Sequence, residues 1–173
     1  MEITGYHGTD ENSVNKISRN GFIPSDNNNW LGQGIYFFGN IKELNISGKS
    51  EAVDWAVKVR KFRSFGIFEA LIISNNYIDI ARDEEHKQLY EDIRRAALAK
   101  HGQLGKLQKD FKESLVFTKL EKIGTADFII ALTDGAKNPP FLNYVVRRPQ
   151  LQICIKNNNC IIKNYLIDCG ESK

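Results

Sequence analysis

The strand-forming segments of this chain lie mostly towards its two ends, and a charged segment with a helical pattern separates them. Residues 79–122 hold 19 of the 45 charged residues, mixed in sign, with apolar residues at helical intervals. Short runs rich in β-branched and aromatic residues, typical of buried strands, occupy 3–6, 35–38, 68–74, 125–132, 151–155 and 160–167. Strands on both sides of a helical block predict an α+β fold rather than a regular alternation of strands and helices.

One domain is expected to contain all of residues 1–173, with the segment at about 79–122 as a helical insert. A chain of 173 residues is long enough for one substantial core, and it contains neither an internal repeat nor a linker. The net charge of +3 excludes a protein that coats nucleic acid by bulk charge. No apolar run reaches the about 18–20 residues of a membrane span, so no membrane partner is expected.

The cysteines and the N-terminal residues indicate a cytoplasmic protein. Cys154, Cys160 and Cys169 are odd in number, and the chain begins without a basic segment followed by an apolar one. Reduced thiols are therefore expected. Their spacing matches no zinc-binding pattern, and no histidine lies near them, so no metal is expected.

Local signals place several element boundaries. Thr9 or Asp10 is expected to cap a first helix that Gly21 ends, and Gly8 to break the strand before it. A second helix is expected to begin at Ser50. Two or three more are expected in the charged segment, covering 83–101 and about 106–119 and joined at Gly102. The segments 151–155 and 160–167 are expected to pair with each other around residues 157–159.

Two short motifs carry the candidate chemistry. His7 ends an apolar strand and precedes Gly8, so a ligand can approach the backbone there, although a structural histidine is the alternative. In residues 30–37, WLGQGIYF, aromatic residues surround two glycines. This motif is either a strand that feeds the core or a platform that stacks a flat heterocycle. It is not a dinucleotide fingerprint, because the preceding strand, the third glycine and the following helix are missing.

In combination, these motifs resemble a known family. YHGT (residues 6–9), NGFIPS (20–25), WLGQGIYF (30–37) and SEAVDWA (50–56) occur in this order. The arrangement resembles the NAD+-binding half of ADP-ribosyltransferases of the His-Tyr-Glu group, which includes poly(ADP-ribose) polymerases and diphtheria-type toxins. The resemblance covers residues 5–56, and it implies a split antiparallel sheet with an NAD+-binding cleft.

The resemblance also assigns roles to individual residues. His7 would hydrogen-bond a ribose hydroxyl of NAD+, the backbone of Gly8 would hold the nicotinamide amide, and Tyr36 would stack on the nicotinamide ring. Ser50, or Ser47 as the alternative, would bind the same amide. Two neighbours of these residues, Thr9 and Gly34, are expected to complete the NAD+ site. Trp55 is either a second stacking surface or part of one face of an amphipathic helix.

The Glu that the family carries on a late strand is missing, because no Glu lies between Glu121 and Glu171. The resemblance places Gln152 at its position, with Gln150 as the alternative on the same strand face. An amide can anchor a ribose hydroxyl, but it cannot place a negative charge opposite a forming cation or act as a general base. This departure argues against chain growth to poly(ADP-ribose).

The expected function is therefore NAD+-dependent mono-ADP-ribosylation of a macromolecule, which is nucleic acid, RNA included, or protein. A bacterial or phage-related toxin or defence effector with a neutralising partner such as an antitoxin would fit. The alternatives are a non-catalytic module that binds NAD+ or ADP-ribose, and an NAD+ glycohydrolase. Two basic clusters are candidates for phosphate or acceptor contact: Lys58, Arg60, Lys61 and Arg63, and Arg147 with Arg148.

Overall fold

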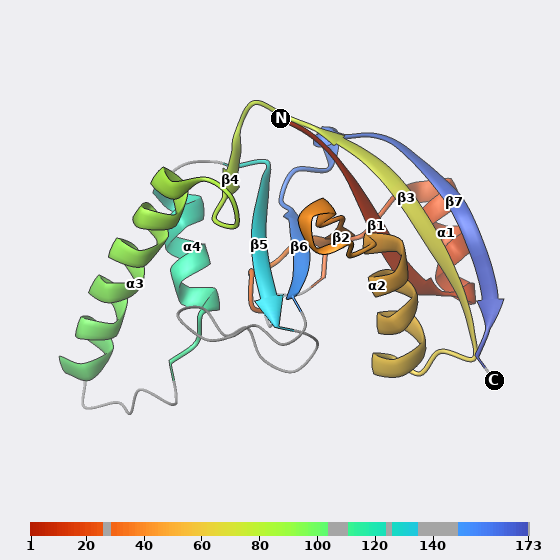
Figure 1. The fold of residues 1–173 in the computed structure, drawn as a ribbon, viewed down its shortest axis with the longest axis horizontal. Coiled ribbons are helices and arrows are strands. Elements are labelled where there is room, and N and C mark those ends of the chain that lie inside the picture. The colour runs from red at the N-terminus through yellow and green to blue at the C-terminus, as the bar shows by residue number, and fades with distance from the viewer. Residues whose placement is uncertain (26–28, 104–110, 124–125, 135–148, 173) are drawn as a thin grey trace.

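The protein has an α+β fold built on one mixed sheet. The computed structural model describes residues 1–25, 29–103, 111–123, 126–134 and 149–172. Within them, seven strands form a sheet of order β4-β5-β6-β2-β1-β3-β7 (Figure 1). The strands are β1 (Glu2–Asp10), β2 (Ile35–Gly39), β3 (Ser64–Ile73), β4 (Tyr77–Asp79), β5 (Phe128–Asp134), β6 (Pro149–Ile155) and β7 (Ile161–Glu171). The helices are α1 (Glu11–Asn20), α2 (Gly48–Asp54), α3 (Glu84–Gln103) and α4 (Ser114–Ile123).

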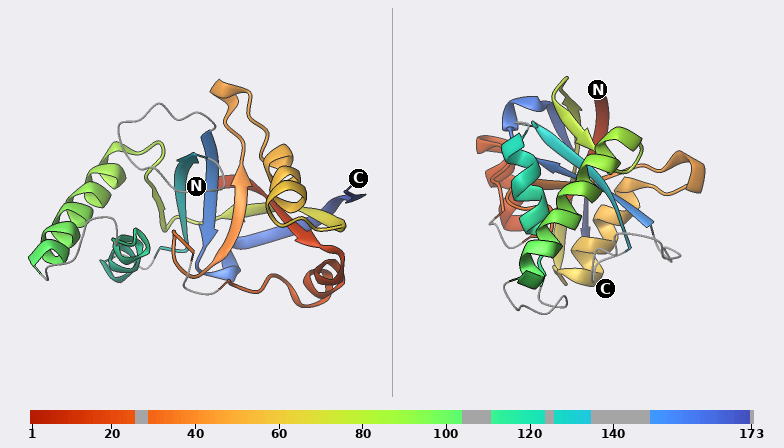
Figure 2. Two further views of the ribbon diagram at one scale, coloured as in Figure 1. Left: turned by 90° about the horizontal axis from the view of Figure 1, so that it is seen from below. Right: turned by 90° about the vertical axis from the view of Figure 1, so that its left-hand side faces the viewer.

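The sheet consists of two halves that meet between β1 and β2. These strands pair at only two positions, Gly5 with Gly39 and Tyr6 with Phe38. On its other side, β1 pairs with β3 from Glu2 to Asp10, and β2 pairs with β6 along its whole length. Beyond Tyr6 the two central strands therefore separate. In the left view of Figure 2, β2, β5 and β6 run nearly upright, whereas β3 and β7 run across the view.

Each half of the sheet has its own helical cover. Figure 1 shows α3 and α4 on the side of β4 and β5, and α1 beside β3 and β7. Three groups of buried apolar residues result. The first joins the two halves and includes Phe22, Phe37, Phe68, Phe128 and Ile153; the second lies under α3 and α4 and includes Tyr90 and Phe117; the third lies under α2 and includes Phe38, Ala52 and Ile67.

The first helix begins and ends where the sequence predicts. Asp10 is its N-cap, and the carboxylate accepts a hydrogen bond from the Ser13 amide at 3.1 Å. Gly21 follows the last turn with a φ of 76°, in the left-handed region that glycine adopts without strain. The prediction that Gly8 ends the preceding strand is wrong, because β1 continues to Asp10 and Gly8 pairs with Ile67 of β3.

Gly8 and Gly48 let α2 pack very closely on the sheet. A Cβ atom on Gly8 would lie 2.5 Å from the Ala52 carbonyl oxygen of α2. A Cβ atom on Gly48, in the first turn of α2, would lie 2.6 Å from the Phe38 carbonyl oxygen. The helix begins at Gly48, earlier than the predicted Ser50, because Ser47 is its N-cap. Its last turn passes into a π-helical turn, Trp55–Val59.

The predicted hairpin of the last two strands is wrong. β6 lies between β5 and β2, whereas β7 pairs with β3 in the other half of the sheet. Residues Asn158–Cys160 form a 3-10 turn rather than a tight hairpin turn, and Asn158 Nδ2 donates to the Phe22 carbonyl at 3.2 Å. The chain therefore crosses from one half to the other at this point, where residues 157–159 were expected to connect neighbouring strands.

The middle of the chain departs from prediction in three details. β4 was not predicted, and it pairs with β5 in parallel, so part of the expected helical insert belongs to the sheet. Gly102 lies inside α3 instead of joining two helices. The following helix, predicted from about residue 106, begins at Ser114, and residues 104–110 lie outside the described part of the chain. Within that part, no helix is both long and apolar enough to cross a membrane.

The two glycine environments predict opposite mutational effects. Gly8→Ala forces a methyl group against the α2 backbone, so we expect a loss of about 1–3 kcal/mol in the free energy of unfolding. Gly102 has open space around its Cβ position and lies in a helix, so Gly102→Ala should raise stability by about 0.5–1 kcal/mol. Urea unfolding followed by circular dichroism measures both. Equal effects would contradict the close packing of α2.

Candidate active site

A small cavity opens where β1 and β2 separate. Its volume is about 60 Å³, and it takes residues from both halves of the sheet and from the end of α2. The lining residues are His7, Gly8, Tyr36, Phe37, Phe38, Trp55 and Gln152. The structure therefore brings together four of the residues expected to form the site, namely His7, Gly8, Tyr36 and Gln152, although they are spread over most of the sequence.

His7 bridges the gap between the two central strands. Its Nδ1 lies 2.8 Å from the Tyr36 carbonyl oxygen, and its ring packs edge-on against Phe22. Because a carbonyl only accepts, Nδ1 carries the proton. Burial lowers the pKa of His7 below its usual 6.5, outweighing the opposite effect of this hydrogen bond. At neutral pH the ring is uncharged, and its Nε2 is an acceptor suited to a hydroxyl group.

Tyr36 is anchored through its phenol to the loop that precedes it. The hydroxyl donates to the Gly32 carbonyl at 2.8 Å and accepts from the Leu31 amide at 3.1 Å. Gly32 has a φ of 80°, so its left-handed conformation shapes the turn that receives the phenol. The ring of Tyr36 is thus fixed in orientation at the wall of the cavity before any ligand arrives.

β6 and Lys156, the residue that follows it, hold the same loop from the other side. Lys156 Nζ donates to the Leu31 and Gln33 carbonyls at 2.6 and 2.7 Å. Trp30 Nε1 donates to Gln152 Oε1 at 2.8 Å, and the Trp30 indole packs edge-on against Phe117 of α4. Gln152 is therefore an oriented amide at the cavity wall, with its oxygen directed to the Trp30 indole.

The contact between two buried polar residues next to the cavity, Gln150 and Glu51, was not predicted from the sequence. Gln150 Nε2 donates to Glu51 Oε2, and the two residues are only 5% and 8% exposed. Gln150 lies two residues before Gln152 on β6, and Glu51 lies four residues before Trp55 on α2. Sequence reasoning considered Gln150 but not Glu51, because nothing in the sequence indicates that α2 reaches β6.

Trp55 connects the cavity to the first basic cluster. The Arg60 guanidinium lies over the Trp55 and Phe62 rings, with its central carbon 5.4 and 5.6 Å from their centroids. Lys61 follows with a φ of 56°, unusual for a residue other than glycine. Lys58 is paired with Asp54 at 2.8 Å. Arg60, Lys61 and Arg63 are exposed beside the aromatic pair.

Other residues expected at the site lie elsewhere. Thr9 is buried on β1 opposite Gly66 of β3. Gly34 packs on β6, where a Cβ atom would lie 2.5 Å from both Cys154 Sγ and the Ile155 carbonyl oxygen. Close packing on β6 thus explains why residue 34 is a glycine.

The two serines of the α2 start are exposed. The Ser47 hydroxyl caps the helix by accepting from the Ser50 amide at 3.4 Å. Neither serine is among the cavity-lining residues named above. The second basic cluster, Arg147 and Arg148, lies outside the described residues.

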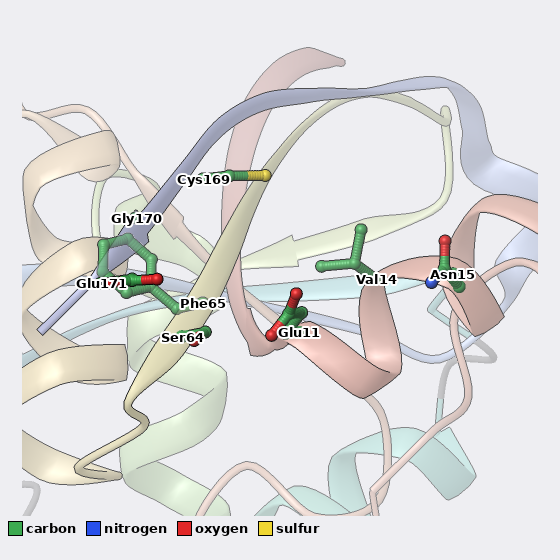
Figure 3. Close-up of a pocket in the computed structure, with 8 residues that line it drawn as sticks. All are labelled: Glu11, Val14, Asn15, Ser64, Phe65, Cys169, Gly170 and Glu171. Carbon is green, nitrogen blue, oxygen red and sulfur yellow. The ribbon is translucent and has the colours of Figure 1, made fainter.

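A larger cavity, of about 390 Å³, lies between α1 and the ends of β3 and β7 (Figure 3). Glu11 and Val14 come from α1, Phe65 from β3, and Cys169 and Glu171 from β7. Its two carboxylates would repel the pyrophosphate of a dinucleotide. The smaller cavity, where the expected residues converge, is therefore the candidate active site. Among the described residues, no group of three or more His, Cys, Asp or Glu side chains is placed to hold a metal ion.

Comparison with known proteins adds one distant relative. The chain is 28% identical to an uncharacterized protein of Methanocaldococcus jannaschii, MJ0359. The match extends over 192 residues and covers 94% of this chain and 86% of that protein. No family model and no solved structure matches. The match therefore includes most of this chain, and the description of the relative names no activity.

The neutral, half-buried His7 predicts a specific pH dependence of stability. Because burial lowers the pKa of His7 in the fold, the unfolded chain takes up this proton first as the pH falls below about 6.5. The resulting stability is complete above that pH and is lost as the pH falls towards the lowered pKa. We expect Tm to fall more steeply between pH 7 and 5 in the wild type than in His7→Gln. Parallel curves in thermal melts would contradict a lowered pKa of His7 in the folded protein.

Proposed function

We propose that this protein is an NAD+-dependent mono-ADP-ribosyltransferase that modifies a macromolecule. The observation that carries the proposal is the convergence of His7, Gly8, Tyr36 and Gln152 on one cavity. These residues were selected from the sequence as one NAD+ site, and three neighbouring strands of the sheet supply them. The separation of β1 from β2 supports the split sheet and the cleft that the resemblance implies.

The size of the cavity indicates which part of NAD+ it would accept. Small-molecule pockets usually enclose about 300–1,000 Å³, and this cavity encloses about 60 Å³. It is suited to one flat end of the molecule, the nicotinamide ring, beside Tyr36 and Trp55. The ribose hydroxyls would then lie at the mouth, where His7 Nε2 can accept a hydrogen bond. Entry of the ring requires a displacement of the cavity wall.

The site supports a dissociative transfer. The bond from ribose C1′ to the nicotinamide nitrogen breaks, and its electron pair leaves with neutral nicotinamide. A lone pair of the acceptor then forms the new bond to C1′, and the proton of the acceptor passes to solvent. His7 and Gly8 would orient the ribose and the amide, so the chain contributes positioning more than covalent chemistry.

Gln152 favours a second candidate, a non-catalytic module that binds NAD+ or ADP-ribose. Its amide carries no charge, and its oxygen accepts a hydrogen bond from Trp30. Such a module would bind NAD+ without releasing nicotinamide. An NAD+ glycohydrolase would instead release free ADP-ribose in the absence of any macromolecule. Calorimetry and product analysis therefore separate the three.

The acceptor would approach over the first basic cluster. Arg60, Lys61 and Arg63 carry exposed positive charges next to Trp55, which itself lines the cavity. The phosphates of a nucleic acid are attracted to such positive charges. This arrangement favours a nucleic-acid acceptor held at one site over a protein acceptor.

Incubation with adenine-labelled NAD+ tests the proposal directly. With purified protein and separate pools of RNA, DNA and protein, we expect label in the RNA or DNA pool and an equal amount of released nicotinamide. Heat-denatured protein is the control. Absence of labelled product from all three pools, with the protein shown to be folded and to bind NAD+, would exclude transfer; it would leave the glycohydrolase if nicotinamide is still released, and the binding module if it is not. Absence of NAD+ binding would exclude both.

Substitutions at the cavity test the assigned residues. His7→Ala and Tyr36→Ala should each lower transfer at least about 100-fold, because they remove the ribose acceptor and the stacking ring. Tyr36→Phe retains the ring and loses only the hydroxyl contacts, so it should keep most of the activity. Tyr165→Ala, at an exposed position on β7, is a matched control. Wild-type transfer rates in both cavity variants would show that the site lies elsewhere.

A further inference from the structure

Glu51 is a buried carboxylate that the steps above leave without a role. It is 8% exposed, and Gln150 Nε2 of β6 donates to its Oε2. Burial of a carboxylate is unfavourable, so a buried one is held by hydrogen bonds or serves a chemical purpose. The chain has no Glu on β6, which is the strand expected to supply the negative charge of the site. A carboxylate reaches that strand nevertheless, from α2.

The backbone places this carboxylate next to the cavity. The Trp55 amide donates to the Glu51 carbonyl, so the two residues lie one turn apart on the same face of α2. Gln150 and Gln152 lie two residues apart on β6, and alternate residues of a strand share a face. Trp55 and Gln152 both line the cavity. The pair of Glu51 and Gln150 therefore lies beside the cavity, two residues before Gln152 on β6 and one helical turn before Trp55.

Because α2 packs closely on the sheet, the Glu51 side chain reaches Gln150 on β6. Without side chains at Gly8 and Gly48, α2 contacts the backbone of β1 and β2 directly. A side chain at either position would push the helix outwards and withdraw Glu51 from β6. The same two glycines thus determine how closely α2 packs on the sheet and where the Glu51 carboxylate lies.

We propose that Glu51, held by Gln150, supplies the negative charge that stabilises the nicotinamide ribose as its bond to nicotinamide breaks. This inference rests on the proposed function and replaces the missing carboxylate of β6 by one from α2. The positive charge of the NAD+ ring passes to ribose C1′ as the electron pair leaves with nicotinamide. In the poorly solvated wall of a cavity, a fixed negative charge acts on that centre more strongly than it would in water. Glu51 acts through this field, with Gln150 as the residue that positions it.

Glu51→Gln tests the charge while it preserves the size of the side chain and its contact with Gln150. We expect nicotinamide release by the variant to fall at least tenfold in kcat, with less than a threefold change in KM. Glu85→Gln, an exposed carboxylate on α3, is the matched control and should keep the wild-type rate. Equal kcat values for the wild type and a folded Glu51→Gln would overturn the inference and leave the proposed function intact.

A binding measurement makes the test independent of turnover. The nicotinamide ring is positively charged in NAD+ and neutral in NADH, so a nearby negative charge favours NAD+. By calorimetry, we expect the wild type to bind NAD+ more tightly than NADH, and Glu51→Gln to reduce this preference at least fivefold. An unchanged preference would count against a role of the Glu51 charge.

Two further outcomes keep the inference separate from its premise. If Glu51→Gln fails to fold in thermal melts, Glu51→Asp retains the charge and should retain the preference for NAD+; its loss in a folded Glu51→Asp would overturn the inference. If the wild type binds neither NAD+ nor NADH, the proposed function itself is wrong, and the inference is withdrawn with it.

Discussion

The contact of α2 with the backbone of β1 and β2 determines the rest of the site. Gly8 and Gly48 remove the side chains that would separate helix and sheet. As a result, α2 places Trp55 at the cavity and Glu51 against Gln150. Neither residue could act there if the helix lay at the usual distance from a sheet. The two glycines, both in the first third of the chain, thus determine where the Glu51 carboxylate lies relative to β6, which belongs to the last third.

Contacts from the strands around it hold the loop before β2 in place. Gln152 of β6 and Lys156, the residue after β6, contact this loop, and Tyr36 of β2 contacts it as well. The contacts of Gln152 and Lys156 join residues that are 122 and 125 positions apart in the sequence, so the loop acquires its shape only when the sheet is complete. The orientation of the Tyr36 ring at the cavity is therefore set when the protein folds and does not depend on ligand binding.

The sequence alone predicted most of the elements and four of the residues that line the small cavity, for identifiable physical reasons. Local signals suffice where neighbouring residues decide the structure, as with Asp10 and Gly21 around α1. They failed for β7, because pairing partners are chosen by the three-dimensional arrangement of the sheet. Gly34 appeared functional but is explained by packing on β6. Glu51 was missed because its relation to Gln150 exists only after α2 and β6 meet.

The short contact between β1 and β2 has a mechanical consequence. The two halves of the sheet are joined there at Gly5 with Gly39 and at Tyr6 with Phe38, and by the bond from His7 to the Tyr36 carbonyl. Within the described sheet, every other pair of neighbouring strands pairs at three or more positions. A rotation of one half against the other at this junction would therefore break the fewest strand pairings. Because the junction borders the cavity, such a rotation would change the width of the cavity.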